Sequence, residues 1–495
     1  MSAPTTLDGL LDAAAEQHPD ALAVTGPDGS HSYAELRAAA LRAAGALAAR
    51  GVAPGDRVVV LGHNRAATVA VLFAAARLGA AFVVLSPTVR SYHLRHILAD
   101  CEPALVVAGD ECRQVLAETG NAVPVLHPDE ATAGPADGAG APPRVPAQGD
   151  RTAALIYTSG STAMPKAVVS THRQMLFAAG AIQDRLELRR SDVIGCFLPL
   201  AFDYGLYQVL LACSAGAALA LGAMSEVGPA LLRLLRERRV TVLPAVPSLA
   251  AALVRLAERT PDRLPPLRVV TNTGAHLTAD HVDAVRRLFP GVRLHPMFGL
   301  TECKRVSILL PEEIDRRPGS VGRPLDGTRC TVVDEDGRPV PPGTVGELVV
   351  QGPNVMTGYW RAPELSARRF RSFDGERALF TGDRCSLDED GYLYFHGRAD
   401  DIYKSRGFRV SSLEVEAAAT DLPGVPAAAL TVTEQAGPVL FATGALEPGE
   451  IAAHLRERLD AYKLPARVVV VPALPLTANG KIDKRALQES LEGTR

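Results

Sequence analysis

The chain has 495 residues, which is longer than one ordinary globular domain, so we expect more than one domain. Hydrophobic residues make up 47% of it and aromatic residues only 5%, so aliphatic side chains must build most of the core. The net charge of −3, with no dominant basic region, argues against a nucleic-acid partner.

The seven cysteines are scattered, odd in number and without C-x-x-C spacing. This pattern predicts reduced thiols in a cytoplasmic protein, not disulfides or a zinc site. The amino-terminal residues contain no basic segment followed by an apolar one, so we expect no signal peptide.

In chain order, Leu7, Leu10, Leu11 and Ala14 recur at helical spacing and predict a helix over 5–17. Ser32 with Glu35 forms the pattern of a capping box and predicts the start of a second helix, which ends near Gly51. Further strands are predicted over 57–61, 81–85, 193–198, 240–243 and 269–273, and further helices over 66–78, 171–186, 226–238, 248–257 and 278–288. This alternation predicts parallel sheets with helices on their faces.

One uncharged stretch, Tyr204–Ser225, is long enough to raise the question of a membrane span. Polar residues and three glycines interrupt it. We therefore expect a buried helix over about 204–213 and a buried strand over about 217–222, with no membrane span.

From about residue 325 the pattern changes to strands separated by Asp, Gly and Pro turns, at 330–333, 346–350 and 391–395. The expected fold class is therefore α/β, with a large N-terminal domain (1–399) of strand–helix subdomains plus a β-rich subdomain. A small mobile α+β domain (400–495) follows, with the boundary at Asp400. Residues 130–150, rich in Ala, Gly, Pro and Asp, predict an exposed loop.

The segment Tyr157–Lys166 follows a short apolar run, 153–156, that predicts a buried strand. A loop with many backbone N–H groups, short hydroxyls and one ammonium suits a polyphosphate. It does not fit the G-x-x-x-x-G-K-[ST] pattern, and by itself it is also compatible with a Ser/Thr-rich surface turn.

Four later motifs follow in order: Met297–Glu302, Phe380–Asp383, Gly397–Asp401 and Asn479–Lys481. Together with the loop they resemble the core motifs of the adenylate-forming superfamily, which includes acyl-CoA synthetases, nonribosomal peptide adenylation enzymes and luciferases. The resemblance runs from about Thr5 to Leu487.

The resemblance implies a two-step reaction. A carboxylate attacks the α-phosphorus of ATP, in the presence of Mg²⁺, to give an acyl-adenylate and pyrophosphate. A thiol, from CoA or from the phosphopantetheine of a carrier protein, then displaces AMP. Because the chain ends soon after Leu487, the expected carrier acts in trans.

The resemblance also implies roles for individual residues. Lys481 would contact the carboxylate and the α-phosphate, Thr301 the α-phosphate, and Glu302 the Mg²⁺. Phe298 would stack on adenine and Asp383 would accept the ribose hydroxyls. The remaining nucleotide-site residues implied are Thr158, Ser159, Gly160, Ser161, Thr162 and Lys166 near the β- and γ-phosphates, Gly274 and Ala275 beside the adenine, Arg398 near the ribose and phosphate, and Arg409.

Asp400 matches the hinge of the family, and Gly407 matches the glycine that lets a pantetheine arm pass, with Arg409 presented in the same step. The loop departs from the family because Ala163 and Ala167 stand where glycine is usual. An alanine held at positive φ costs about 1 kcal/mol, which would affect rate and not the class of activity.

The acyl pocket leaves two readings open. Asp203 matches the aspartate that pairs with the α-amino group in amino-acid-activating members, but Phe-Asp-Tyr-Gly also resembles free-standing acyl-CoA ligases. Asp203 and Arg305 could form a structural ion pair, or Arg305 or Lys304 could hold a second carboxylate of the substrate. The other pocket residues expected from the resemblance are Phe202, Tyr204, Tyr207, Ser248, Thr271, Thr273, Met297 and Val306, and the two tyrosines favour a small or flat acid.

The sequence thus predicts a ligase that joins a small carboxylic acid to a thiol. The rival hypotheses are an amino-acid-activating enzyme that loads a separate carrier, an adenylating enzyme with a non-thiol acceptor, and an inactive nucleotide-binding scaffold.

Overall fold

The computed structural model describes residues 4–120, 122–133, 142, 144–146, 148–158, 164–274, 277–398, 402–405, 408–433, 436–459, 463–477 and 480–492. The chain divides into two compact units. The first comprises Met1–Arg329 and Val350–Leu379, and the second comprises Cys330–Val349 and Phe380–Arg495.

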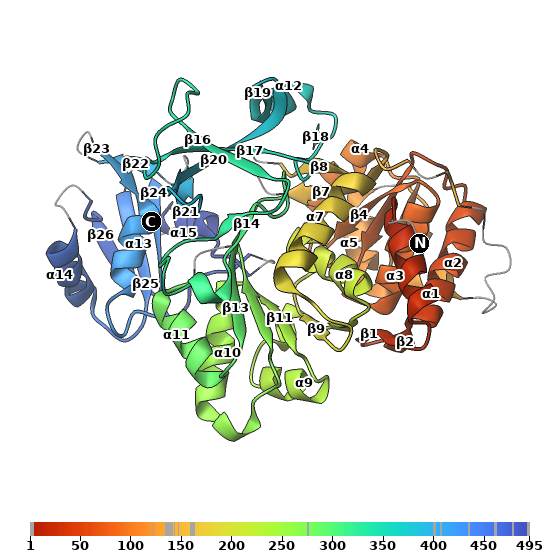
Figure 1. Ribbon diagram of the computed structural model, residues 1–495, viewed down its shortest axis with the longest axis horizontal. Coiled ribbons are helices and arrows are strands. Elements are labelled where there is room, and N and C mark those ends of the chain that lie inside the picture. Colours follow the sequence, from red (N-terminus) through yellow and green to blue (C-terminus); the bar gives the residue numbers. More distant parts are fainter. Residues whose placement is uncertain are drawn as a thin grey trace. The chain divides into compact units, whose positions relative to one another are not determined.

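A nine-stranded sheet of the first unit has the order β15-β14-β13-β12-β11-β9-β10-β1-β2 (Figure 1). The strands from β13 to β1 are parallel to their neighbours, and antiparallel strands close both edges. The bounds are β1 (Leu22–Gly26), β2 (Gly29–Ser32), β9 (Val193–Cys196), β10 (Ala218–Leu221), β11 (Val242–Ala245), β12 (Val269–Asn272), β13 (Arg293–Phe298), β14 (Ser307–Ile308) and β15 (Arg323–Pro324).

A seven-stranded sheet in the same unit has the order β18-β8-β7-β4-β3-β5-β6. Its strands from β7 to β6 are parallel, while β8 and β18 add antiparallel at one edge. The bounds are β3 (Arg57–Leu61), β4 (Ala81–Leu85), β5 (Leu105–Ala108), β6 (Val125–Leu126), β7 (Thr152–Thr158), β8 (Lys166–Thr171) and β18 (Gly358–Tyr359).

Helices connect and cover these sheets. Their bounds are α1 (Leu7–Gln17), α2 (Tyr33–Ala49), α3 (Ala66–Arg77), α4 (Ser91–Cys101), α5 (Arg113–Thr119), α6 (Pro128–Thr132), α7 (His172–Leu186), α8 (Asp203–Ala215), α9 (Leu231–Glu237), α10 (Pro247–Arg259), α11 (Ala279–Leu288) and α12 (Pro363–Arg369). Short 3₁₀ turns occupy η1 (Asp110–Cys112), η2 (Met224–Glu226), η3 (Pro261–Arg263) and η4 (Pro311–Glu313).

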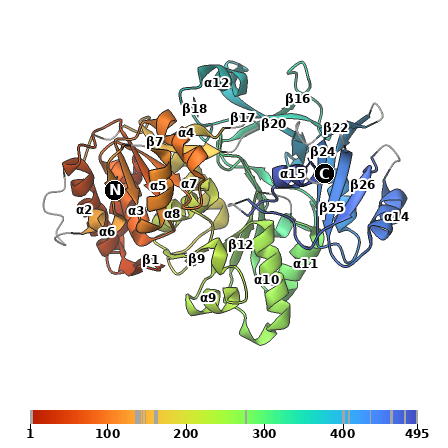
Figure 2. The ribbon, with the colours of Figure 1, turned by 180° about the vertical axis from the view of Figure 1, so that it is seen from behind.

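The seven-stranded sheet is covered on both faces, which explains why its inner strands carry runs of apolar residues, as in Val58–Leu61 of β3. Along β3, Val58 and Val60 belong to the large core that α1, α2, α3, α7 and α8 share with both sheets. Val59 and Leu61 point the other way and pack with Leu94 of α4, which is visible from behind in Figure 2. Successive side chains of a strand face opposite sides, so a strand buried on both faces loses the polar alternation.

A five-stranded sheet has the order β16-β17-β20-β19, with β21 paired to β20. The boundaries between the two units fall within β16, β17 and β20. The second unit continues with a two-stranded sheet β22-β23 and a three-stranded sheet β24-β25-β26. The bounds are β16 (Arg329–Val333), β17 (Gly346–Gln351), β19 (Phe370–Phe373), β20 (Glu376–Leu387), β21 (Leu393–Arg398), β22 (Ile402–Ser405), β23 (Phe408–Ser411), β24 (Ala427–Thr433), β25 (Gly437–Thr443), β26 (Arg467–Val470), α13 (Ser412–Thr420), α14 (Pro448–Arg458) and α15 (Lys484–Glu492).

The predicted alternation of strands and helices is confirmed, and so is the capping box of Ser32 and Glu35 at the start of α2. The uncharged stretch folds as α8 followed by β10, as expected. Within the described residues, no helix is long and apolar enough to cross a membrane. The elements that the sequence analysis did not predict include the strands β1, β2, β5, β6, β8, β13, β14, β15, β18, β19 and β20 and the helices α4, α5, α6 and α12.

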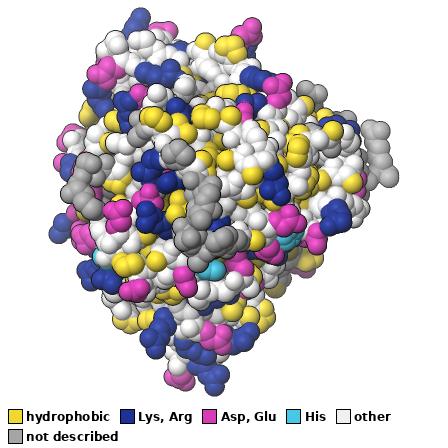
Figure 3. Space-filling model, turned by 90° about the vertical axis from the view of Figure 1, so that its right-hand side faces the viewer, with side chains coloured by type: hydrophobic (Ala, Val, Ile, Leu, Met, Phe, Trp, Pro, Cys, Tyr) yellow, Lys and Arg dark blue, Asp and Glu magenta, His cyan; other side chains and the backbone are white. Residues whose placement is uncertain are grey.

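All seven cysteines are free thiols, as predicted. On the face shown in Figure 3, acidic and basic side chains are interspersed, with no extended region of one sign. Of the loop predicted over 130–150, residues 134–141, 143 and 147 lie outside the described residues, and residues 130–132 belong to α6.

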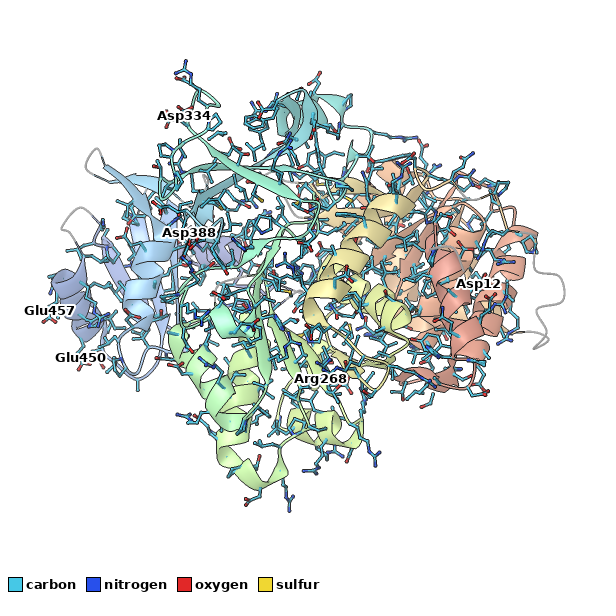
Figure 4. All side chains as sticks on the ribbon, viewed as in Figure 1. Asp12, Arg268, Asp334, Asp388, Glu450 and Glu457 are labelled. Atoms are coloured by element: carbon cyan, nitrogen blue, oxygen red, sulfur yellow. The ribbon has the colours of Figure 1, made fainter. Side chains whose placement is uncertain are left out.

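A buried polar network ties the amino ends of three parallel strands together. Asp192, immediately before β9, is 2% exposed and accepts from both Nε and Nη2 of Arg268, which is labelled in Figure 4 and precedes β12. The Thr241 hydroxyl, before β11, also donates to Asp192 at 2.8 Å. Burial opposes ionisation of Asp192, but these donors hold the pKa of its carboxyl below the ordinary value.

One buried histidine makes the stability of the first unit depend on pH. The backbone N–H of Leu7 donates to Nδ1 of His172 at 3.2 Å, so the ring must be neutral. Burial lowers the pKa of His172 from 6.5 to about 4. Between these pH values the unfolded chain binds the proton and the folded chain does not, so stability falls as the pH falls through this window.

We therefore predict that His172→Asn removes about 3 kcal/mol of pH-dependent stability, the value of a shift of this size. Urea unfolding at several pH values between 4 and 7 checks this, by comparing how steeply the free energy of unfolding changes with pH in the wild type and in the variant. His295, whose burial also lowers its pKa to about 4, contributes equally to both proteins. The partly exposed His93→Asn is the control for the loss of a histidine as such. A dependence of stability on pH that stays unchanged in His172→Asn contradicts the prediction.

Candidate functional site

The candidate site lies at the carboxyl ends of the parallel strands β9, β11, β12 and β13 (Figure 1). In open α/β sheets, ligands bind at this edge because the connecting loops meet there. The segment after β9 leads into α8, the segment after β11 into α10, and Thr273 and Gly274 follow β12. After β13 comes the turn 299–305, which carries most of the predicted chemistry.

The turn 299–305 folds back tightly on itself. A Cβ at Gly299 would lie 2.0 Å from the carbonyl oxygen of Lys304, so no other residue fits there without moving the turn. Lys304 itself adopts the left-handed conformation with φ 58°. The fully buried Asn354 holds the turn in place, because its Nδ2 donates to the carbonyl oxygens of Cys303 and Arg305, each at 3.1 Å.

This turn buries two consecutive cations. Lys304 is 4% exposed and Arg305 is 7% exposed. Nη1 of Arg305 donates to Oγ1 of Thr273 at 2.7 Å, and its Cζ lies 5.3 Å from the centre of the Tyr204 ring. Nζ of Lys304 lies 6.0 Å from the centre of the Tyr207 ring.

Three of the polar atoms around these cations have no hydrogen-bond partner among the described residues: Lys304 Nζ, Arg305 Nε and the Tyr207 hydroxyl. Burial lowers the pKa of Lys304 from 10.5 to about 8 and also lowers that of Arg305, while Asp203 acts in the opposite direction on both. Buried donors left without acceptors are costly, so a bound molecule that supplies acceptors here would be favourable.

Asp203 is the first residue of α8, and helical spacing (i, i+4) puts it on the same face of that helix as Tyr207. The Tyr204 hydroxyl lies 2.5 Å from Oγ1 of Thr271, which orients the ring. The structural ion pair between Asp203 and Arg305, which the sequence analysis left open, is not found among the described residues. Arg305 turns instead to Thr273 and to the face of Tyr204, leaving the Asp203 carboxylate as a separate negative group.

The remaining predicted pocket residues lie on the same edge of the sheet. The Phe202 ring meets Tyr204 edge to face, with 6.2 Å between ring centres. Ser248 lies in the first turn of α10, and Met297 near the end of β13. Val306 is fully buried, and its N–H donates to the Phe298 carbonyl oxygen at 2.9 Å. The contact of its side chain with a substrate stays a prediction.

The predicted phosphate loop joins two antiparallel strands, and the register places Thr158 of β7 opposite Lys166 of β8. Ser159, Gly160, Ser161, Thr162 and Ala163 lie outside the described residues, so their roles stay predictions. Ala167 lies within β8 and is absent from the non-glycine residues with positive φ. The strain considered for an alanine at this position therefore does not arise.

Glu302 lies in the turn after β13, close to the end of the phosphate-loop hairpin. Its Oε1 accepts from the Tyr359 hydroxyl at 2.6 Å, and Nζ of Lys166 lies 4.4 Å from the centre of the same tyrosine ring. One carboxylate fits Mg²⁺, because this ion usually takes one or two carboxylates and otherwise binds water and substrate phosphates. No cluster of three or more metal-ligating side chains occurs among the described residues, so phosphates would have to complete such a site.

Thr301 is partly exposed in this turn and Phe298 ends β13, positions that put both on the edge predicted to hold the nucleotide. Gly274, with φ 93°, is exposed just after β12. Ala275 lies outside the described residues.

In the second unit, Asp383 of β20 and Arg398 of β21 are paired across the sheet, with 3.3 Å between Oδ1 and Nε. Lys481 is exposed next to a tight turn, in which Gly480 has φ 74° and its N–H donates to the Thr477 carbonyl oxygen at 2.9 Å. The role of Lys481 stays a prediction. Asp400, Gly407 and the side chain of Arg409 lie outside the described residues, so the hinge and the thiol tunnel stay predictions.

Sequence reasoning missed Asn354 and Tyr359, which hold the turn 299–305 from a distant part of the chain. Their segment, Asn354–Tyr359, carries no charge and no periodicity, so it gave no signal of this role. Since both act through residues about 50 positions away, spacing alone could not connect them to the site.

The fold matches that of known proteins. The chain belongs to the AMP-binding enzyme family: the family model matches residues 11–360, and the model of the AMP-binding enzyme C-terminal domain matches residues 414–481. The predicted fold class, with a large N-terminal and a small C-terminal domain, is confirmed by matching structures.

Three similar proteins show the range of this family. Phosphinothricin tripeptide synthetase PhsC of Streptomyces viridochromogenes is 34% identical over 98% of this chain, which spans only 45% of that protein. The complex of VinN with L-aspartate is 40% identical, with a TM-score of 0.74 over 79% of this chain and 98% of that one. ATP-bound MatB from Rhodopseudomonas palustris is 28% identical, with a TM-score of 0.87 over 99% of both chains.

We predict that Lys304→Met increases the free energy of unfolding by about 1–2 kcal/mol, since it replaces a buried ammonium without a hydrogen-bond partner by an apolar chain of similar length. Urea unfolding at pH 7 measures this. Lys463→Met is the matched control, because that lysine forms a 2.7 Å ion pair with Glu414 near the surface and should change stability little. A loss of stability in Lys304→Met would mean that the buried ammonium is satisfied in the folded protein.

Proposed function

We propose that this protein uses ATP and Mg²⁺ to adenylate an amino dicarboxylic acid, and then transfers the aminoacyl group to a phosphopantetheine thiol of a separate carrier protein or to CoA. The seven free thiols fit a reducing compartment, so we place this reaction in the cytoplasm. This choice of substrate joins the two readings of the acyl pocket that the sequence left open.

The observation that carries the proposal is the group of buried donors without partners: Lys304 Nζ, Arg305 Nε and the Tyr207 hydroxyl. Two adjacent cations and a hydroxyl match the oxygen atoms of a carboxylate, and charge-assisted hydrogen bonds to an anion are the strong ones. Because the reacting carboxylate must reach the nucleotide, the one held here is a second carboxylate. The similarity to VinN, whose structure contains L-aspartate, supports the same class of acid.

Asp203 supplies the opposite charge on the same edge of the sheet. A carboxylate that makes no ion pair with Arg305 is available to an ammonium group of the substrate. An acid with one amino group and two carboxylates would thus be held at both ends, which leaves its reacting carboxylate oriented toward the nucleotide.

In the first half-reaction, the substrate carboxylate displaces pyrophosphate from the α-phosphorus of ATP. Two anions approach each other, so the residues around them must supply positive charge and hydrogen-bond donors. We assign this task to Lys481, Thr301 and Lys166, with Asp383 and Arg398 binding the ribose side of the nucleotide. Mg²⁺ at Glu302, when bound, neutralises phosphate charge and orients the leaving pyrophosphate.

We predict acid-dependent exchange of pyrophosphate into ATP with L-aspartate and closely related amino dicarboxylic acids, well above exchange with L-asparagine, L-alanine, succinate or benzoate. Lys481→Ala should lower this exchange by at least a hundredfold, because the approaching anions lose their neutralising charge. Lys463→Ala is the matched control and should leave exchange intact. Exchange with benzoate or a fatty acid but with no amino acid would contradict the proposed substrate class.

We further predict that Arg305→Met and Lys304→Met each raise the KM for the amino dicarboxylic acid at least tenfold while the KM for ATP stays unchanged. Loss of a hydrogen bond to a charged group is worth about 1.5–3 kcal/mol. With L-asparagine as substrate, the KM should rise less in the same variants, since that acid has no second carboxylate. Asp203→Asn should lower the exchange with every amino acid and leave any residual exchange with succinate unchanged.

Equal losses for every acid in Lys304→Met and Arg305→Met would mean that these cations support the fold of the turn and do not recognise a carboxylate. The exchange panel and these variants therefore test the activity and the substrate class separately.

A further inference from the structure

Tyr359 belongs to β18, a two-residue strand at one edge of the seven-stranded sheet. Strand β18 pairs antiparallel with β8, with Tyr359 opposite Val168, and the next N–H, that of Trp360, donates to the Ala167 carbonyl oxygen at 2.9 Å. Since Lys166 begins β8, this pairing fixes Tyr359 beside the end of the phosphate-loop hairpin.

The Tyr359 side chain touches two oppositely charged groups at its two ends. Its hydroxyl donates to Oε1 of Glu302 at 2.6 Å, and Nζ of Lys166 lies 4.4 Å from its ring centre, within the range of a cation–π contact. The ring is held in turn by Phe370, which it meets edge to face at 5.6 Å between centres. At 6% exposure the side chain has little freedom to move.

The segment around Tyr359 also holds the main chain of the turn that carries Glu302. The Met356 N–H donates to the Glu302 carbonyl oxygen at 2.8 Å, and Asn354 binds the next carbonyl groups of the turn. Residues 354–359 thus form hydrogen bonds with both the backbone and the carboxylate of Glu302. The hydrogen bond from Tyr359 is therefore one of several between the two segments.

We propose that Tyr359 is a positioning residue for the magnesium–triphosphate part of ATP. Its hydroxyl fixes one oxygen of Glu302, so that the other oxygen, which no described residue hydrogen-bonds, faces a metal ion. Its ring holds the Lys166 ammonium at a set distance from that carboxylate. One rigid side chain therefore spaces the negative group that binds the metal and the positive group that binds phosphate. This role rests on the proposed function.

The two contacts of the Tyr359 side chain can be removed separately by substitution. Tyr359→Phe removes the hydroxyl from Glu302 but keeps the ring under Lys166 and against Phe370. Tyr359→Leu removes both contacts. Tyr33→Phe is the matched control, because the fully buried Tyr33 hydroxyl, 2.7 Å from the Ala217 carbonyl oxygen, lies in the core and not at the nucleotide edge.

The test is calorimetric binding of ATP to the full chain, with and without Mg²⁺, and needs no turnover. For Tyr359→Phe we expect the dissociation constant with Mg²⁺ to rise about tenfold, the lower range for losing a hydrogen bond to a charged group, with less than a twofold change without Mg²⁺. The Mg²⁺ concentration that gives half-maximal ATP binding should rise in parallel. Tyr359→Leu should weaken binding under both conditions, and Tyr33→Phe under neither.

The outcomes separate this inference from the proposed function. Wild-type protein that binds ATP with Mg²⁺ dependence, together with an unchanged Tyr359→Phe, would overturn the positioning role alone. Weakening of equal size with and without Mg²⁺ in Tyr359→Phe would also overturn it, since a general structural defect does not discriminate. Wild-type protein that binds no ATP would overturn the proposed function and this inference together.

Discussion

The burial of Lys304 and Arg305 side by side at the carboxyl edge of a parallel sheet is the constraint on which the candidate site depends. Two cations inside a protein are unfavourable unless partners surround them, and among the described residues only Oγ1 of Thr273 accepts a side-chain hydrogen bond from Arg305. The turn that carries them needs a glycine at 299, a left-handed Lys304 and the amide of Asn354 to keep its shape. Such local cost is characteristic of a site that is completed by its ligand.

The two ends of the parallel strands treat buried charge in opposite ways. At the amino ends, the Asp192 carboxylate is paired with Arg268 and also accepts a hydrogen bond from Thr241. At the carboxyl ends, the donors of Lys304 and Tyr207 are left without acceptors among the described residues. A paired buried carboxylate adds to the rigidity of the sheet, whereas buried donors without acceptors favour a ligand that supplies them.

The nucleotide part of the site is organised by a different element, the short strand β18. Through Tyr359 it links the carboxylate of Glu302, in one sheet's connecting turn, to the ammonium of Lys166, at the start of a strand in the other sheet. Both sheets of the first unit thus contribute to one group of charges. Membership of the AMP-binding enzyme family is consistent with this arrangement, since these residues lie within or next to the matched range 11–360.

The sequence by itself determined the alternation of strands and helices, the capping box at Ser32, and the candidate residues Asp203, Glu302, Lys304 and Arg305, because periodicity and motif order are local properties of the chain. Only the tertiary structure decided that Arg305 turns to Thr273 and not to Asp203, and that Ala167 lies in an extended strand without strain. It alone revealed Asn354 and Tyr359 as the supports of the turn. The physical reason is that hydrogen bonds between residues about 50 positions apart, and the direction in which a long cationic side chain points, are fixed by packing of distant segments, which no local pattern records.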